Sequence, residues 1–131
     1  MPANGNVVLD TNIAIAFMAG DRLICQRVAE SEQVILSIVV VGELYFGAHR
    51  SGRLEHNLKR AEELAANSEV VDVTMETARN YGVIKTALRR KGTPIPDNDI
   101  WIAALAQQFG AVVATRDSHF DAVDGLAVVR W

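Results

Sequence analysis

Four acidic residues in four separate stretches carry the chemistry that this sequence suggests. They are Asp10 in VVLDTN, Glu43 in VVVGELYFGA, Asp99 in PIPDNDIWIAALA and Asp117 in VVATRDSHF. Each lies within or beside strongly apolar sequence, where an unpaired carboxylate is costly to desolvate. Because too few basic residues lie nearby to pair each acid, we expect the four to converge on a divalent cation. Ligands that are all oxygen indicate Mg²⁺ or Mn²⁺ rather than zinc.

Each acid also has a plainer explanation when it is taken alone. Asp10 stands just before an apolar run and could be an ordinary helix N-cap. Glu43 could lie at the edge of a packed helix, with its long stem reaching water. Only the combination favours a shared site.

The elements that must position these acids alternate between strand and helix. Apolar runs predict strands over 6–9, 34–37, 70–73, 111–115 and 126–129. Helical spacing and capping residues predict helices over 13–19, 22–31, 38–49, 53–67, 74–91 and from 97 or 98 to 109. Ser37, Thr74 and either Asp97 or Asn98 are the expected N-caps, and Gly92 and Gly110 the expected C-terminal stops.

Such alternation predicts an α/β fold with a mostly parallel sheet flanked by helices, in one domain over 1–131. Asp10 and Asp117 directly follow strands, and Asp99 and Glu43 lie in the early turns of helices. In a parallel sheet, strand C-termini and the following helix N-termini share one edge. The order of the elements therefore brings the four acids toward the same edge.

The composition is that of a globular protein and excludes a general polycation. Hydrophobic residues make up 50% and charged residues 22%, with a net charge of −3. The one concentrated basic cluster contains Arg89, Arg90 and Lys91. These cations could contact RNA phosphates, or simply suit a helix C-terminus.

No signal peptide is expected, and every apolar run is shorter than the ~18 residues that span a bilayer. We therefore expect a cytoplasmic protein without a membrane anchor. The single Cys25 cannot form an internal disulfide and fits a packing position.

An ordered set of motifs resembles the PIN-domain ribonucleases, and among them the VapC-type toxins of toxin–antitoxin pairs. The motifs are LDTN, S-x-V-V-x-x-E-L-x-x-G, G-x-P-I-x-x-x-D-x-x-I-A-A and T-R-D-x-x-F, spread from about Val7 to Trp131. The resemblance implies a PIN-like sandwich, a metal-dependent endoribonuclease site and a homodimer. It also implies a small VapB-type antitoxin that blocks the cleft, and products that carry a 5′-phosphate and a 3′-hydroxyl.

The resemblance places Asp10, Glu43, Asp99 and Asp117 on the family's acidic positions. We expect Asp10 and Asp99 to be the principal ligands of Mg²⁺ or Mn²⁺, completed by Asp117 directly or through water. Glu43 would bind the metal or orient the attacking water.

The remaining candidates surround these four acids. Thr11, Asn12 and Thr115 are expected to donate hydrogen bonds to the carboxylates. Asp97 is interpreted as a helix cap in preference to an accessory acid.

Two further side chains from the last motif are harder to place. Arg116 could contact a substrate phosphate or pair with a neighbouring acid. We interpret His119 as a surface residue without a catalytic function.

Two other functions fit the same sequence. One is a housekeeping nuclease that acts in RNA maturation. The other is a catalytically weak RNA-binding or regulatory module, in which the acids are only structural. Growth arrest on expression, and its loss in Asp10→Asn, would separate a toxin from such a module.

Overall fold

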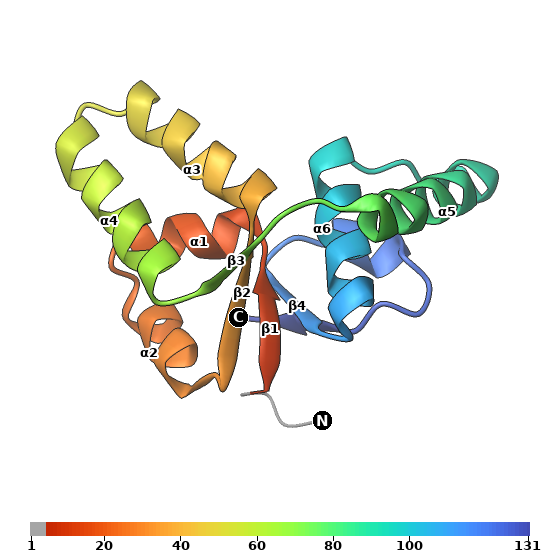
Figure 1. Ribbon diagram of the computed structural model, residues 1–131, viewed down its shortest axis with the longest axis horizontal. Coiled ribbons are helices and arrows are strands. Elements are labelled where there is room, and N and C mark those ends of the chain that lie inside the picture. Colours follow the sequence, from red (N-terminus) through yellow and green to blue (C-terminus); the bar gives the residue numbers. More distant parts are fainter. Residues whose placement is uncertain (1–4) are drawn as a thin grey trace.

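A parallel five-stranded sheet forms the centre of the molecule, seen in Figure 1 between two groups of helices. The computed structural model describes residues 5–131. The strands are β1 (Asn6–Leu9), β2 (Gln33–Ser37), β3 (Glu69–Val71), β4 (Val112–Thr115) and β5 (Val128–Arg130). Their order is β3-β2-β1-β4-β5, and all four strand pairs are parallel. The predicted α/β class with a mostly parallel sheet is confirmed.

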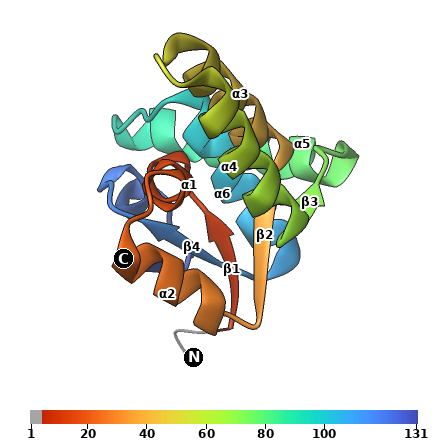
Figure 2. The same cartoon turned by 90° about the vertical axis from the view of Figure 1, so that its left-hand side faces the viewer.

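Helices cover both faces of this sheet. They are α1 (Thr11–Met18), α2 (Arg22–Glu30), α3 (Ile38–Arg50), α4 (Leu54–Ala66), α5 (Met75–Lys91), α6 (Asp97–Phe109) and the short 3₁₀ helix η1 (His119–Ala122). Helices α1 to α4 lie on one side, and α5 and α6 on the other, as the two views in Figure 1 and Figure 2 show. Strands buried on both faces read as continuous apolar runs, which explains sequences such as VVL and VILS.

Most helix ends follow the local signals in the sequence. The Ser37 hydroxyl accepts a hydrogen bond from the backbone N–H of Val39 at 3.1 Å and caps α3. Thr74 and Thr77 form a reciprocal capping box at the start of α5. Gly92 and Gly110 end α5 and α6 with φ angles of 70° and 61°, a left-handed conformation that glycine adopts without steric cost. These predicted caps and stops are confirmed.

The start of α6 differs from the sequence prediction. Pro96 occupies the N-cap position, and its carbonyl accepts from the N–H groups of Asp99 and Ile100. Neither Asp97 nor Asn98 caps the helix, so that prediction was wrong. Pro96 already has an extended backbone, ψ 144°, which puts Asp97 inside the first turn rather than before it. The last strand, Val128–Arg130, begins two residues later and ends one residue later than predicted.

Helix α6 is a buried helix that lies between the sheet and α5. Five consecutive residues, Ile102 to Ala106, are fully buried. The helix packs against α5, β1 and β4. Its N-terminus thereby comes to the edge of the sheet where β1 and β4 end. No helix in the described part of the chain is long and apolar enough to cross a membrane.

Candidate metal centre

Asp10 is the deepest acid of the site. It follows β1 directly, caps α1 and is only 4% exposed. One carboxylate oxygen accepts from the backbone N–H of Thr11 at 2.7 Å, and the other accepts from the Thr115 hydroxyl at 2.7 Å. A carboxylate oxygen can accept more than one such bond, so both oxygens retain capacity for a cation.

The sheet topology explains why Asp10 meets residues from the other end of the chain. The chain moves from β1 outward through β2 and β3, then returns to the far side of β1 to form β4 and β5. The adjacent ends of β1 and β4 are thus a topological switch point, where open α/β sheets bind their ligands. The Asp10 N–H continues the pairing by donating to the Ala114 carbonyl at 3.0 Å.

Asp99 and Asp117 reach this point from two further elements. Asp99 lies in the first turn of α6, where the helix dipole favours an anion. Asp117 follows β4, and its backbone N–H donates to the Thr115 hydroxyl at 2.9 Å. The same hydroxyl donates to Asp10, so Thr115 links both acids.

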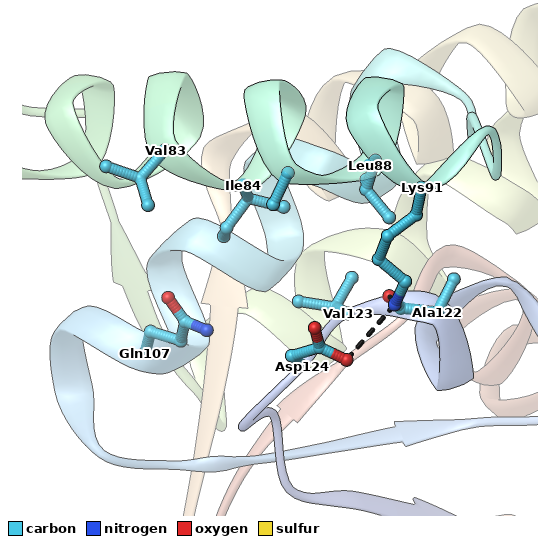
Figure 3. A pocket seen from close by; sticks show the side chains of 9 residues that line it. Val83, Ile84, Leu88, Lys91, Gln107, Ala122, Val123 and Asp124 are labelled. Carbon is cyan, nitrogen blue, oxygen red and sulfur yellow. Dashed lines mark hydrogen bonds and ion pairs between the residues drawn. The ribbon is translucent and has the colours of Figure 1, made fainter.

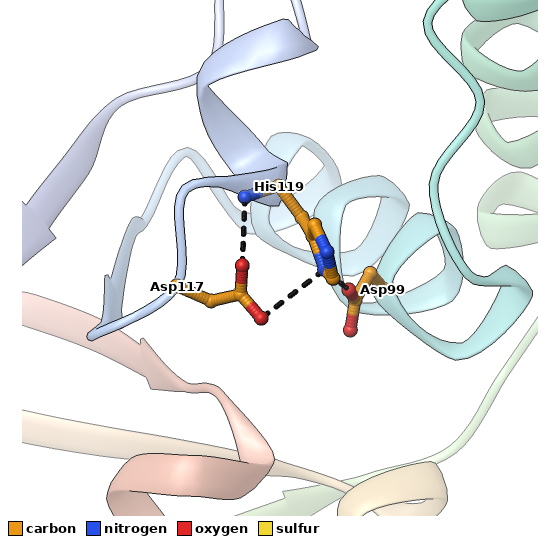
Figure 4. A group of neighbouring side chains, drawn as sticks. All are labelled: Asp99, Asp117 and His119. Carbon is orange, nitrogen blue, oxygen red and sulfur yellow. Dashed lines mark hydrogen bonds and ion pairs between the residues drawn. The ribbon is translucent and has the colours of Figure 1, made fainter.

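His119 lies between Asp99 and Asp117, as Figure 4 shows. Its Nδ1 atom is 2.8 Å from Asp99 Oδ2 and 3.1 Å from Asp117 Oδ2. Its backbone N–H also donates to Asp117 Oδ1 at 2.9 Å. The prediction of a surface residue is confirmed only in part, and the absence of a catalytic function stays a prediction. The ring is partly exposed, but it contacts two of the four predicted acids because η1 turns it back toward α6.

Glu43 reaches the same cleft from α3 and is held by a residue that the sequence did not single out for this task. Asn98 donates from its side-chain amide to Glu43 Oε1 at 2.6 Å. This contact joins the N-terminal turn of α6 to the middle of α3. The proximity of Asn98 to Asp99 in sequence was the only available signal.

An open cleft of about 340 Å³ contains the four predicted acids. It is lined by Asp10, Thr11, Asn12, Ile15, Glu43, Pro96, Asn98, Asp99 and Asp117. Within residues 5–131, no lysine or arginine forms an ion pair with any of the four acids, and His119 is their one basic partner. The acids are therefore not explained as a set of separate salt bridges.

The surroundings of the cleft disfavour the charged form of its aspartate carboxylates. Burial raises the pKa of Asp10 above its ordinary value, and the charges of Asp99 and Asp117 raise it further. Hydrogen bonds from Thr115 and Thr11 offset part of this rise. Burial likewise raises the pKa of Asp99. The hydrogen bond to Asp99 in turn raises the pKa of His119. A bound cation would offset the cost of burial and the repulsion between these carboxylates by neutralising their charge.

The residues present fit a divalent cation. Carboxylate oxygens from Asp99 and Asp117, together with a His119 ring nitrogen, all lie within 4.8 Å of one another. Asp10 faces the same cleft and carries a hydrogen bond on each oxygen that fixes its orientation. Hydrogen-bonded carboxylates of this kind are typical of metal ligands.

Asp97 lies outside the cleft. Its carboxylate pairs with Lys85 at 3.0 Å, and this hydrogen bond lowers the pKa of Asp97. Asp97 therefore acts neither as the predicted cap nor as an accessory acid in the cleft.

Of the other two predicted donors, Thr11 donates to Asp10 through its backbone rather than its side chain, and the prediction for Asn12 was wrong, since among the described residues it accepts a hydrogen bond and donates none to an acid. Thr11 offers its backbone N–H to Asp10, and Asn12 accepts at 3.4 Å from the Arg116 N–H. The guanidinium of Arg116 pairs with Asp21 at 3.0 Å, and its Nε donates to the Trp131 carbonyl. For Arg116 the structure thus shows pairing with an acid, one of the two alternatives.

The predicted basic cluster divides into paired and unpaired cations. Lys91 donates to the Ala122 carbonyl at 2.7 Å and pairs with Asp124 at 3.1 Å. Figure 3 shows this pair at the edge of a mostly apolar hollow of about 200 Å³ between α5 and the segment after η1. The hollow has no second acid, so it does not resemble a metal site. Arg89 and Arg90 form no ion pair within the described residues and are exposed.

The parallel sheet and the acidic cleft at its switch point place this chain among α/β proteins with a candidate metal centre. Comparison with known protein families identifies the family. The sequence model of the PIN domain family matches residues 7–126, and the chain belongs to this family.

Two named relatives cover between 77% and 95% of the chain. It is 30% identical over 129 residues to "Ribonuclease VapC1" of Haemophilus influenzae (strain R2866), covering 95% of this chain and 96% of the relative. It is 32% identical over 102 residues to "tRNA(fMet)-specific endonuclease VapC" of Salmonella typhimurium, covering 77% of each. The crystal structure of DNA-bound VapBC from Salmonella typhimurium matches with a TM-score of 0.89 at 31% identity, covering 96% of this chain and 98% of the other. The predicted resemblance and the PIN-like fold are confirmed.

Proposed function

We propose that this protein is a metal-dependent endoribonuclease and the toxin of a VapBC-type toxin–antitoxin pair. One observation carries the proposal. Asp10, Asp99 and Asp117 meet at the ends of β1 and β4 without a lysine or arginine partner within the described chain. Relatives named as ribonucleases and an endonuclease support RNA as the substrate.

The chain's own residues then have distinct tasks. Asp10 and Asp99 are the principal ligands of Mg²⁺ or Mn²⁺, and Asp117 completes the site. A divalent cation supplies Lewis acidity at the phosphate and activates water for attack. Thr115 holds Asp10 and the Asp117 backbone in place, so the ligands need little reorganisation when the cation and the RNA bind.

Glu43 orients the attacking water. Its hydrogen bond from Asn98 occupies Oε1 and fixes the carboxylate, and Glu43 lines the cleft. A positioned carboxylate of this kind can accept a proton from water as the phosphorus–oxygen bond forms. As the water oxygen bonds to phosphorus, the bond between phosphorus and the 3′ oxygen breaks and that oxygen takes up a proton from solvent. The products then carry a 5′-phosphate and a 3′-hydroxyl.

A VapB-type antitoxin is the proposed protein partner. The solved VapBC structure from Salmonella typhimurium supports such an assembly. A mostly apolar groove of about 220 Å³ adjoins the acidic cleft and shares Ile15 and Glu43 with it. Ile15 is 52% exposed, so a partner that covers the groove would also cover the entrance to the site.

The proposed homodimer needs an apolar surface elsewhere. On α5, Met75 and Val83 are 73% and 71% exposed, the two highest values among the exposed large apolar side chains of the described residues. Light scattering on the purified chain tests the proposed dimer.

Cleavage of total RNA tests the proposed function. The wild type should cut RNA with Mg²⁺ or Mn²⁺ and not with EDTA, and mapped ends should carry a 5′-phosphate. Asp99→Asn should abolish cleavage, because it removes a ligand charge. Asp97→Asn is the matched control on the same helical turn, since Asp97 pairs with Lys85 outside the cleft. Equal cleavage by wild type and Asp99→Asn would contradict the proposal.

Expression in a bacterial host separates a toxin from the alternatives. Wild type should arrest growth, coexpression of the cognate antitoxin should restore it, and Asp10→Asn should be harmless. A housekeeping nuclease would not arrest growth. A regulatory RNA-binding module would keep its effect in Asp10→Asn.

A further inference from the structure

We infer that His119 is itself a ligand of the proposed cation, which makes the centre a mixed oxygen and nitrogen site that favours Mn²⁺ over Mg²⁺. The inference deepens the proposed function and rests on it. Its basis is the position of the His119 ring between Asp99 and Asp117 in Figure 4.

The spacing of the donor atoms fits one cation. His119 Nδ1 is 2.8 Å from Asp99 Oδ2 and 3.1 Å from Asp117 Oδ2. Octahedral Mg²⁺ has bonds of about 2.0–2.1 Å, so adjacent ligands at right angles lie about 3 Å apart. The two measured distances lie on either side of that value. All three donor atoms are also within 4.8 Å of one another.

The backbone holds His119 at this position. Its own N–H donates to Asp117 Oδ1, while its ring approaches the other oxygen of the same carboxylate. The residue that follows, Phe120, is fully buried and anchors η1 in the core. Asp99 approaches from the separate helix α6. The ring therefore faces two acids supplied by different elements, which a freely exposed surface histidine would not do.

The same distances also fit a second arrangement, in which His119 is only a counter-ion of the two acids. A counter-ion would occupy the position of the cation and would have to leave when the cation binds. A ligand would stay and bind through nitrogen. Removing the imidazole should weaken Mn²⁺ binding if His119 is a ligand and should leave it unchanged or tighter if His119 is a counter-ion. The Mn²⁺ affinity therefore separates the two arrangements.

The ligand type has a consequence for metal choice. Carboxylates alone suit Mg²⁺ and Mn²⁺ alike, whereas imidazole nitrogen suits transition metals. A nitrogen ligand should therefore raise the affinity for Mn²⁺ more than the affinity for Mg²⁺. Replacing His119 by Asp would supply an oxygen in place of the nitrogen and remove this preference.

Pulsed electron paramagnetic resonance of the Mn²⁺-loaded protein detects a directly coordinated imidazole nitrogen through its ¹⁴N modulation. The chain has three histidines, and His49 and His56 lie exposed on α3 and α4. The His49→Gln/His56→Gln variant should therefore keep the ¹⁴N signal, and His119→Gln should lose it. His119→Gln should also bind Mn²⁺ about tenfold more weakly or worse, in the range seen when residues around a metal site are replaced. His119→Asp should keep Mg²⁺ binding and lose the preference for Mn²⁺.

Two results overturn the inference without touching the proposed function. One is Mn²⁺ bound to the wild type with no coordinated ¹⁴N signal. The other is unchanged or tighter Mn²⁺ binding by His119→Gln, which is the result for a displaced counter-ion. If the wild type binds no Mn²⁺ or Mg²⁺, the proposed function fails as well.

Discussion

The Thr115 hydroxyl donates a 2.7 Å hydrogen bond to Asp10 Oδ2, and the two residues are 105 positions apart in the chain. Thr115 is fully buried and Asp10 almost so. The bond therefore orients the carboxylate of a proposed metal ligand within the core, at the junction of β1 and β4. It is a direct contact between the N-terminal and C-terminal parts of the sequence at the proposed metal centre.

Thr115→Val should destabilise the protein and weaken metal binding together. The substitution keeps the shape and leaves a buried carboxylate oxygen without its donor, at a cost of about 1–3 kcal/mol. Urea unfolding measures the loss of stability, and Mn²⁺ affinity measures the effect on the site. Thr77→Val is the matched control, because Thr77 is equally buried but bonds to Gln108 at the far end of α6. It should lose stability and keep its Mn²⁺ affinity. Equal metal affinities in the two variants would contradict the assigned position of Thr115.

The metal-free protein should lose stability as the pH rises above 3.8, through Asp10 and Asp99, and again as it rises above 6.5, through His119. The folded-state pKa values of Asp10, Asp99 and His119 are all raised above their ordinary values of 3.8 and 6.5. A raised pKa means that the folded state holds its proton more tightly than the unfolded state does. The stability that this proton gives is complete below the ordinary value and is lost as the pH rises through the folded-state value.

Thermal unfolding in EDTA measures this decline, and added Mn²⁺ should raise the unfolding temperature more at the higher pH. The pKa values of Asp21 and Asp97 are lowered, so their contribution to stability is lost only when the pH falls below 3.8. It does not change at the higher pH values of this experiment. His119→Gln should flatten the part of the curve above 6.5. Stability of the metal-free protein that increases toward the higher pH would contradict the described electrostatics.

Asn98→Ala should slow RNA cleavage without unfolding the protein. The 2.6 Å bond from Asn98 fixes Glu43, and a hydrogen bond to a charged group contributes about 1.5–3 kcal/mol. A loss of 1.4 kcal/mol at the transition state is a tenfold lower rate, so we expect a decrease of about tenfold or more. Single-turnover cleavage measures it, with Gln107→Ala on the exposed face of α6 as the control. A rate equal to that of the wild type would show that Glu43 does not depend on Asn98.

Arg89→Ala/Arg90→Ala should weaken RNA binding in a salt-dependent manner. These two arginines are exposed and form no ion pair within the described residues, whereas Arg116 pairs with Asp21. Each lost phosphate contact to single-stranded RNA should reduce the slope of log affinity against log salt by about 0.7. Arg116→Ala should leave this slope unchanged and lower stability slightly. A slope altered by Arg116→Ala alone would favour the other interpretation of Arg116.

Local signals in the sequence predicted the elements well because caps and stops act over a few residues. Ser37, Thr74, Gly92 and Gly110 define helix ends through their own side chains or φ angles. The start of α6 was misplaced because Asp97 and Asn98 are both good caps in isolation. Pro96 has an extended backbone and occupies the N-cap position in their place. The Asp97 carboxylate forms an ion pair with Lys85 instead of capping the helix.

The site was predicted less completely because its contacts join distant elements. The common edge of a parallel sheet was enough to bring Asp10, Glu43, Asp99 and Asp117 into one cleft. The directions of the His119 ring and the Asn98 amide depend on how η1 and α3 pack against α6, which no local pattern encodes. His119 stands two residues after Asp117, and that spacing was the signal that could have marked it.

The most direct test of the central claim is calorimetric titration of Mn²⁺ into the purified protein. The account predicts saturable binding by the wild type, the same affinity in Asp97→Asn, and loss of binding in both Asp10→Asn and Asp99→Asn. Asp10 and Asp99 come from separate elements, so loss in both variants shows that they serve one cation. Wild-type affinity in either of these two variants would contradict the shared metal centre.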